Sequence, residues 1–272
     1  LGEINNKGIE ALLSVNPIRK DNFDWSFSIN FAKNNNTVVR LPDELENPET
    51  GEKEYTLIGI GVPGSGYTSF TIYEGYPMAV FTVPAPKRVE GGEYDGFLIV
   101  DSNNGLPIVS TEIDKVGDSE YDYIMGFGNT LRYKNLTFEF TIDIRQGGLM
   151  YSRTADMTYF SGTNLETTYN DRQPFVIPNS VVEVLEDGEV VGYVENTTPI
   201  VNTVPSNQIG GDMNVYWQNG ADQLASKFLI DKSFIKLRSA SLSYSLPQKW
   251  MNKIFLGSVN FSFIGRNLLV YT

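Results

Sequence analysis

The stretch DKSFIKLRSASLSYSLPQKWMNKIFLGSVNFSFIGRN, residues 231–267, decides between two kinds of β protein. Near its end, Phe261 and Phe263 share one side of an expected strand. Their polar neighbours Asn260 and Ser262 take the other side. A soluble β-sandwich would bury the two aromatic rings in its core, whereas a membrane-spanning sheet would point them at lipid.

The same alternation recurs earlier in the chain. In Phe23–Asn34 the large apolar side chains fall on one face and the small polar ones on the other. In Leu136–Gln146 the Phe and Ile side chains alternate with Thr, Glu, Asp and Arg. We therefore expect antiparallel strands at Gly8–Val15, Trp25–Lys33, Asn129–Lys134, Leu136–Gln146, Phe234–Leu246 and Gly257–Asn267.

Turn residues join several of these strands. The sequence NPIRKDN, residues 16–22, predicts the turn after the first strand, and Lys134 with Asn135 predicts a tight turn. Asp187-Gly188 lies between two apolar runs and favours a type I′ hairpin turn. Helix signals are short, at Asp222–Phe228 and Gln248–Ile254.

Two long polar segments, Pro42–Tyr123 and Ser152–Asn219, separate the strands. Compact domains rarely carry connections of this length. Outer-membrane barrels do, with short turns on one side and long loops on the outer side. We expect both segments to supply outer loops, some with short hairpins of their own.

The composition excludes several functions. The 272 residues contain no Cys and no His, which removes thiolate nucleophiles, histidine triads and Cys/His zinc sites. The net charge of −12, with no cluster of Lys or Arg, disfavours nucleic-acid binding. No carboxylate pair for glycoside hydrolysis is identifiable. We predict a protein that is not an enzyme and has no catalytic, metal or cofactor residues.

Two motif-like stretches do not change that prediction. Gly59, Gly61 and Gly64 fit the dinucleotide-binding spacing, but Pro63 and a β-rich sequence replace the helix that must follow. Asp101–Glu112 fits a calcium loop poorly, because its sixth position is Leu106 rather than Gly. A flexible glycine-rich loop and an Asn-Gly turn are the better interpretations.

Taken together, the segments resemble the SusC/RagA family of TonB-dependent outer-membrane transporters. SFIKLRSASLSYSLPQKW from Ser233 and FIGRNLLVYT from Phe263 are similar to the family's S-F-x-K-L-R, a tyrosine strand ending in L-P, and a later G-x-N-L. GEINNKGIEALL from Gly2 is similar to the family's N-x-G-x-E hairpin start. YEGYPMAVF from Tyr73 and NTLRYKNLTFEFTIDIRQGGLMY from Asn129 follow in the family's order, and Asp156–Gln208 matches loosely.

The resemblance implies an all-β fold, with antiparallel strands forming part of a large transmembrane barrel with long extracellular loops. It implies active import of nutrients, either oligosaccharide (glycan) or peptide, across the outer membrane of Gram-negative, Bacteroidetes-type bacteria. The TonB complex would supply energy through a plug domain, and a SusD-like surface lipoprotein would capture the ligand. Besides the substrate, outer-membrane lipid is the other expected partner.

Residues 1–272 are expected to be one partial barrel domain, the C-terminal part, without the plug, the N-terminal region and the last strand. Plugged outer-membrane transporters have about 22 strands, so the chain would supply roughly a third of a barrel. The alternative is a secreted all-β module that binds carbohydrate or acts as an adhesin.

Two sets of residues are candidates for function. Glu139, Asp143 and Arg145 would line the barrel lumen, although the pattern alone slightly favours the solvated face of a soluble strand. A second set consists of loop aromatics that could stack on a ligand, namely Tyr73, Tyr76 and Trp217. The alternative for the aromatics is that they pack into small cores of their own loops.

Overall fold

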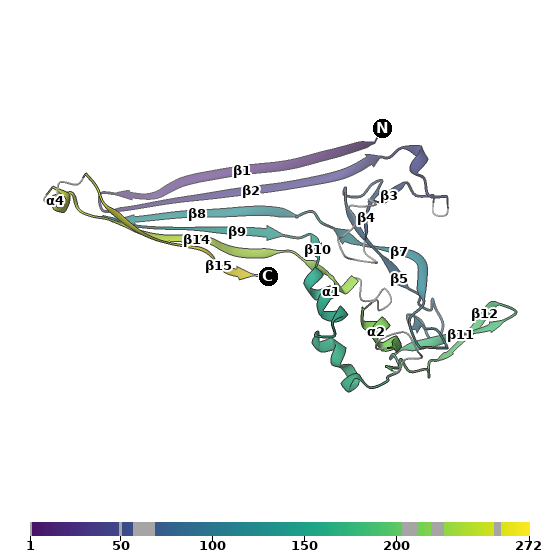
Figure 1. Cartoon of the computed structure of the whole chain (residues 1–272). Coiled ribbons are helices and arrows are strands. Elements are labelled where there is room, and N and C mark those ends of the chain that lie inside the picture. Colours follow the sequence, from purple (N-terminus) through teal and green to yellow (C-terminus); the bar gives the residue numbers. More distant parts are fainter. Residues whose placement is uncertain (1, 49–50, 57–68, 203–210, 219–225, 253–256) are drawn as a thin grey trace. The chain divides into compact units, whose positions relative to one another are not determined.

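The computed structural model describes residues 2–48, 51–56, 69–202, 211–218, 226–252 and 257–272. The chain forms two compact units (Figure 1). The sheet unit comprises residues 2–40, 119–148 and 231–272, and the insert unit comprises residues 41–118 and 149–230. The insert unit is therefore made of the two long segments that separate pairs of strands in the sequence.

The sheet unit is one antiparallel sheet of six strands in the order β1-β2-β8-β9-β14-β15. The strands are β1 (Glu3–Lys20), β2 (Phe23–Arg40), β8 (Tyr123–Tyr133), β9 (Leu136–Gln146), β14 (Phe234–Ser245) and β15 (Asn260–Tyr271). Every strand expected from alternation is present, and β9 has the predicted bounds. Six strands are about a quarter of a 22-stranded barrel, less than the third expected from chain length.

Several boundaries differ from the prediction, among them the end of β2, which continues past Lys33 to Arg40. Residues 16–20 are not a turn, because β1 continues to Lys20 and the turn is Asp21-Asn22. Pro17 is accommodated by a register shift between Val15 and Ile18, where its missing N–H disrupts no ladder bond. β8 begins at Tyr123 rather than at 129, since Gly126 and Gly128 weaken the strand signal although they pair regularly.

β15 also differs, beginning at Asn260 and continuing to Tyr271 past the predicted end. A β-bulge lies within this strand pair. The register shifts between Leu237 and Ser239 on both sides of β14: Arg238 is an extra residue relative to β9, whereas on the other side Asn267 and Leu268 of β15 both lie opposite it. Opposite it, Asn267 takes a left-handed conformation, with φ of 54°. The extra residue changes which alternate positions of β14 lie on the apolar face, from Ile235 and Leu237 before it to Ala240 and Leu242 after it.

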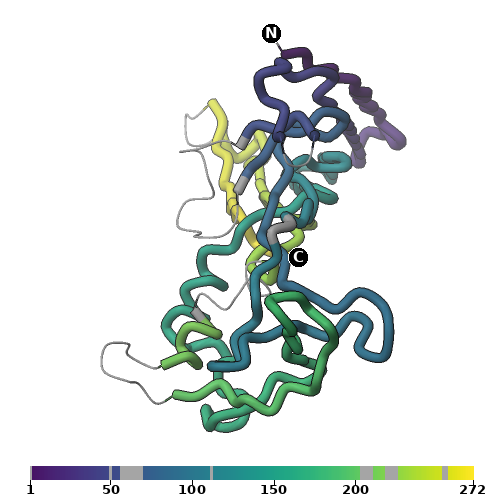
Figure 2. The backbone as a smooth tube through the Cα atoms, turned by 90° about the vertical axis from the view of Figure 1, so that its right-hand side faces the viewer, coloured from purple at the N-terminus to yellow at the C-terminus, as the bar shows by residue number. Residues whose placement is uncertain are grey.

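Within its described residues, the insert unit contains three small sheets. One has four antiparallel strands, β3 (Glu54–Thr56), β4 (Ser69–Tyr73), β5 (Val80–Pro86) and β7 (Val109–Asp118). A second contains β6 (Leu98–Ile99), β11 (Ser180–Glu186) and β12 (Glu189–Glu195), and the third contains β10 (Leu149–Tyr151) and β13 (Leu229–Asp231). β6 and β11 pair in parallel, so segments far apart in the sequence lie side by side (Figure 2).

The sequence patterns did not predict four helical segments that the described part of the insert unit contains. They are η1 (Asp43–Leu45), α1 (Arg153–Phe160), η2 (Leu165–Arg172) and α2 (Gly211–Gln218). α1 begins at Ser152, whose hydroxyl accepts a hydrogen bond from the Ala155 amide in the usual N-cap arrangement. Of the predicted helices, α4 (Gln248–Met251) is present in the sheet unit. Residues 222–225 of the other lie outside the described part.

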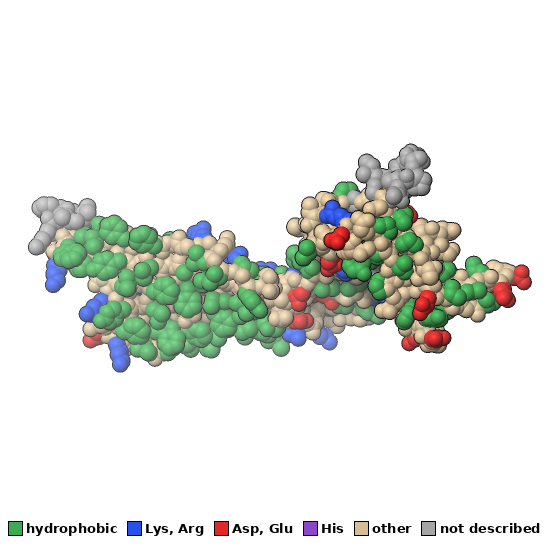
Figure 3. Space-filling model, turned by 90° about the horizontal axis from the view of Figure 1, so that it is seen from below, with side chains coloured by type: hydrophobic (Ala, Val, Ile, Leu, Met, Phe, Trp, Pro, Cys, Tyr) green, Lys and Arg blue, Asp and Glu red, His purple; other side chains and the backbone are tan. Residues whose placement is uncertain are grey.

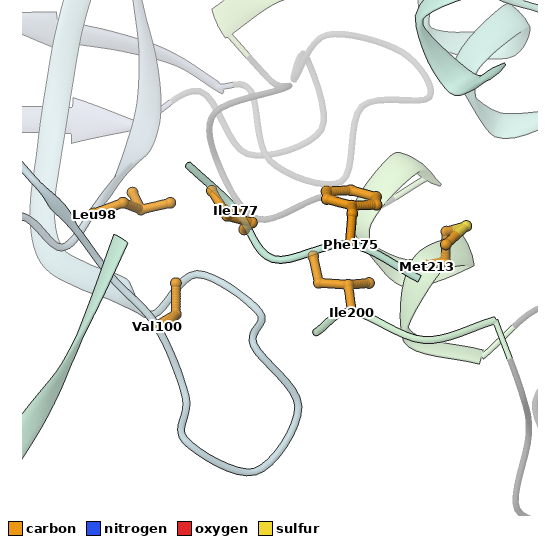
Figure 4. Close-up of a cluster of buried hydrophobic side chains, with 6 residues drawn as sticks. All are labelled: Leu98, Val100, Phe175, Ile177, Ile200 and Met213. Carbon is orange, nitrogen blue, oxygen red and sulfur yellow. The ribbon is translucent and has the colours of Figure 1, made fainter. Parts of the chain in front are cut away.

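The insert unit has its own hydrophobic core, so its two segments are not open loops. One cluster joins Leu98, Val100, Phe175, Ile177, Ile200 and Met213. In Figure 4 the Phe175 ring lies beside Ile200, with Met213 of α2 next to it. The predicted hairpin is confirmed here: β11 and β12 are joined by Asp187 and Gly188, both with positive φ. No helix among the described residues is long and apolar enough to cross a membrane.

Candidate functional site: the two faces of the six-stranded sheet

One face of the six-stranded sheet is apolar across all its strands. Cross-strand pairing aligns side chains in rows, and one row is Leu13–Ile29–Phe127–Ile142–Leu237–Leu269. A second apolar row is Ile18–Trp25–Leu131–Phe138–Leu242–Phe263. Figure 3 shows this face as a continuous hydrophobic surface. On β2 the apolar side chains extend over nine residues, from Phe23 to Phe31, the length of a tilted transmembrane strand.

No second sheet covers the apolar face within the described residues. Phe263 is 79% exposed and Leu269 is 69% exposed, values that a sandwich core would not allow. The clusters of buried hydrophobic residues all lie in the insert unit. The one polar side chain in the middle of this face, Asn129, accepts a hydrogen bond from the indole of Trp25 at 3.3 Å. The Phe261 and Phe263 rings therefore lie on a face without a protein cover.

The opposite face is polar and built mainly from small side chains. One of its rows is Ser14–Ser28–Gly128–Thr141–Ser239–Arg266. This face is hollowed, with a cavity of about 540 Å³ over its middle. Ser243 and Ser262 share a hydrogen bond of 2.9 Å across β14 and β15. The sheet thus has one apolar face and one polar face.

The three predicted charges lie on this polar face. Glu139 accepts a hydrogen bond from the Ser241 hydroxyl at 3.4 Å. Asp143 forms a salt bridge of 3.3 Å with Arg238. The guanidinium carbon of Arg145 lies 5.2 Å from the centre of the Tyr121 ring, within cation–π range. All three charges therefore have partners on the face where the alternation placed them.

Two arginines of this face were not predicted. Arg266 lines the hollow, and Arg238 reaches Asp143 from the bulge. Arg266 continues the two-residue period of Asn260 and Ser262, so alternation places it on this face, whereas Arg238 is the extra residue of β14 relative to β9. A strict two-residue period cannot assign the face of a bulged residue.

The three candidate stacking residues lie in the insert unit, in different surroundings. Tyr73 is buried, and its burial, with a hydrogen bond from its hydroxyl to Glu54, raises its pKa to about 12. Tyr76 is 41% exposed, and Lys115 lies 4.7 Å from its ring centre. Trp217 of α2 is half-buried and lines a separate pocket. Of the two tyrosines, only Tyr76 therefore presents its ring to solvent.

The two ends of the sheet differ in their connections. At one end, Asp21-Asn22, Lys134-Asn135 and the α4 segment close the strand pairs, and Lys134 N donates to Asn22 O. An aromatic row, with Tyr133 and Tyr244, lies just inside this end. At the other end both long segments leave and re-enter the sheet. Short turns opposite long connections, with aromatic residues near the edge, are typical of outer-membrane barrels.

Comparison with known proteins agrees with this geometry. No family model matches the chain. It is 26% identical over 286 residues to TonB-dependent receptor P3 of Formosa agariphila, covering the whole chain and 25% of that protein. It is 24% identical over 152 residues to TonB-dependent receptor SusC of Bacteroides thetaiotaomicron, covering 56% of the chain and 15% of SusC. The resemblance to the SusC/RagA family is confirmed.

Solved structures agree on the fold. The RagAB peptide transporter superposes on the whole chain with a TM-score of 0.60 at 17% sequence identity, using 26% of its own chain. The fold is therefore that of part of a large TonB-dependent transporter barrel. The chain spans about a quarter of the length of the TonB-dependent receptors that it matches throughout.

Proposed function

We propose that this chain forms part of the wall and of the extracellular surface of a SusC-like transporter that imports nutrients across the outer membrane. The observation that carries the proposal is the sheet with an uncovered apolar face and a hollowed polar face. An apolar face of this size is unstable in water but stable against lipid hydrocarbon. The apolar stretch of β2, nine residues from Phe23 to Phe31, has the length of a tilted transmembrane strand.

The polar face would then line the lumen. Glu139, Asp143 and Arg145 are assigned there, together with Arg266. The small serine, threonine and glycine side chains between them leave space beside the wall, which suits a wide barrel filled by a plug. The substrate would be an oligosaccharide or a peptide, and the family relationship supports both.

The proposed partners follow from the same relationship. A SusD-like surface lipoprotein would meet the extracellular segments, and the TonB complex would act through the plug domain of the full-length protein. The protein would lie in the outer membrane of a Gram-negative bacterium and would not be an enzyme. The proteins that it resembles are a TonB-dependent receptor and a peptide transporter.

The runner-up function, a secreted carbohydrate-binding or adhesin module, has less support. A sandwich module needs a second sheet about 10 Å from the first to cover the apolar face. Phe138, Phe263 and Leu269 all remain exposed in the described structure.

The test is the topology of the full-length protein in intact cells. A cysteine replaces Glu189, next to the tip of the β11–β12 hairpin, or Lys134, in a short turn of the sheet. Because the chain has no cysteine of its own, each substitution adds one thiol to this region. We expect a membrane-impermeant maleimide to label Glu189→Cys on intact cells, and Lys134→Cys only after the outer membrane is permeabilised. Labelling of both sites on intact cells, or reversed labelling, would contradict the proposal.

A further inference from the structure

The insert unit contains a pocket of about 360 Å³, within the size range of small-ligand sites. Its walls come from the end of α1, the turn that follows, η2, the coil at Asn202, and α2. The lining residues are Tyr159, Phe160, Ser161, Gly162, Thr167, Arg172, Asn202, Met213, Asn214 and Trp217. All of them belong to the insert unit, so the pocket lies within one compact body.

The aromatic wall of this pocket is held by ring packing. The Trp217 ring centre lies 6.2 Å from that of Tyr159 and 4.9 Å from that of Tyr216, the latter edge-on. Phe175 packs against Trp217 from the core at 6.4 Å, beside Met213 (Figure 4). Phe160 contributes a ring that is 51% exposed. A fixed aromatic wall with an open side favours a ligand with a flat apolar face.

Arg172 reaches the pocket from an unusual backbone. Asn170, Asp171 and Arg172 are consecutive non-glycine residues with φ of 50°, 50° and 59°. Such conformations are rare singly for L-amino acids, and they concentrate at functional positions. Arg172 Nη2 donates to the Gly162 carbonyl at 2.7 Å, and Asn202 Nδ2 donates to the Arg172 carbonyl at 3.0 Å. The backbone and these two bonds fix the guanidinium at the rim.

The charges at this pocket favour an anionic group on the ligand. Arg172 is the only charged side chain among the lining residues, although the whole chain carries a net charge of −12. One of its five N–H groups donates to Gly162, which leaves others to bind a carboxylate or sulfate. The Asn202 side-chain oxygen can accept a hydrogen bond from a ligand hydroxyl.

The shape of the walls favours a sugar over a peptide. Extended peptides are commonly bound by pairing with an exposed strand edge. The lining residues of this pocket lie on helices, turns and coil, and none lies on a strand. A pyranose ring needs only a ring face and side-chain hydrogen bonds, which Trp217, Arg172 and Asn202 supply.

We propose that this pocket is a binding subsite for an acidic sugar residue of an imported oligosaccharide. The sugar ring lies against Trp217, and its carboxylate or sulfate binds Arg172. This inference rests on the proposed transport function and deepens it, since it selects the oligosaccharide from the two substrate classes.

The experiment measures binding to the purified full-length protein in detergent by isothermal titration calorimetry. The probes are a tetragalacturonate, a sulfated galactan tetrasaccharide, the neutral maltotetraose and tetra-alanine. The variant is Arg172→Gln, and the matched control is Arg88→Gln, because Arg88 also donates to a glycine carbonyl, that of Gly96, at 2.8 Å. Both variants are first checked for assembly in the outer membrane.

We expect one or both acidic tetrasaccharides to bind and Arg172→Gln to weaken that binding at least about tenfold, while Arg88→Gln leaves it unchanged. Comparison of the two acidic probes tells carboxylate from sulfate. Binding of tetra-alanine that depends on Arg172 would overturn the assignment in favour of a peptide. Equal binding of neutral and acidic sugars, or binding of none while the protein assembles in the outer membrane, would overturn the inference and leave the transport proposal standing.

Discussion

Each side chain of the six-stranded sheet lies on either its apolar or its polar face. Neighbouring residues along a strand lie on opposite faces. Phe140 and Thr141 of β9 illustrate this. Phe140 pairs with Ala240 on the apolar face, and Thr141 pairs with Ser239 on the polar face. Adjacent positions on one strand therefore allow a closely matched test of the lipid-facing assignment.

The first prediction compares Phe140→Arg with Thr141→Arg in the full-length protein. We expect Phe140→Arg to cost about 2–4 kcal/mol, because it places a charge near the bilayer midplane, and to impair assembly strongly. Thr141→Arg should assemble nearly normally, since its neighbours Gly128 and Ser239 are small. Folded protein in the outer membrane is measured by its altered migration in unheated gels. Equal tolerance of the two substitutions would refute the assignment of faces.

The second prediction concerns Gly148, which follows β9 with φ of 76°. A β-carbon at this position would lie 2.5 Å from the carbonyl oxygen of Glu120. We expect Gly148→Ala to destabilise the protein by about 1–2 kcal/mol from conformation alone, and by more through this contact. The control is Gly192→Ala in β12, where a β-carbon meets no atom within 4 Å. Thermal unfolding in detergent should show a lower midpoint for Gly148→Ala only.

At the scale of elements, an ion pair joins η2 to the segment before β13. Lys227 Nζ lies 2.7 Å from a carboxylate oxygen of Glu166. Hydrogen bonds from Lys227, and then from the Tyr159 hydroxyl, lower the pKa of Glu166 below its ordinary value of 4.5. Because the pKa of Glu166 is lower in the folded state, the ionised carboxylate and its hydrogen bonds stabilise the fold. This contribution to the free energy of unfolding is complete above pH 4.5 and is lost as the pH falls through the lowered pKa.

The third prediction follows from that linkage. Amide-exchange protection factors for residues 153–172, corrected for intrinsic rates, should fall between pH 6 and pH 3. In Glu166→Gln the protection should be lower at pH 6 and nearly independent of pH. A wild-type pH profile that persists in Glu166→Gln would show that another group is responsible.

The elements also show how far the sequence predicts the fold. β9 was located correctly because its five apolar residues alternate without interruption between a tight turn and Gly147. The β1 boundary was missed because Pro17 and the charged residues after it imitate a turn, although an extended edge strand tolerates them. The faces of Glu139 and Asp143 followed from period-two alternation, whereas that of Arg238 required knowledge of the bulge.

The insert unit was predictable only as two long segments. Its core combines Leu98, Phe175 and Met213, which are far apart in the sequence. Contacts between residues so far apart produce no periodic pattern in the local sequence. In addition, α1 and α2 have only eight residues each, which is too short for a reliable helical pattern. Of the residues that line the aromatic pocket, the sequence therefore indicated only Trp217, and no local sequence pattern indicated Arg172.

At the scale of the whole molecule, the wall and the insert unit should be separable. The fourth prediction replaces residues 148–232 of the full-length protein with a six-residue Gly/Ser linker. Arg145 pairs directly with Phe234, so a short linker can join the strands at that point. We expect the variant to assemble in the outer membrane and to lose uptake of its substrate. As a control, the same linker is inserted at Lys134-Asn135. If the control assembles and the deletion variant does not, the insert unit is needed to build the wall.

The adjacency of strand ends has an evolutionary consequence. Ala32 of β2 pairs with Ile124 of β8, as Arg145 of β9 does with Phe234 of β14, so each long segment begins and ends on neighbouring strands. The free energy of closing a loop between fixed ends rises only with the logarithm of its length. Insertions, deletions and exchanges in these segments therefore disturb the six-stranded sheet little. Under the proposed function, a lineage would acquire new nutrients by recombining whole segments at these junctions while inheriting the same barrel wall.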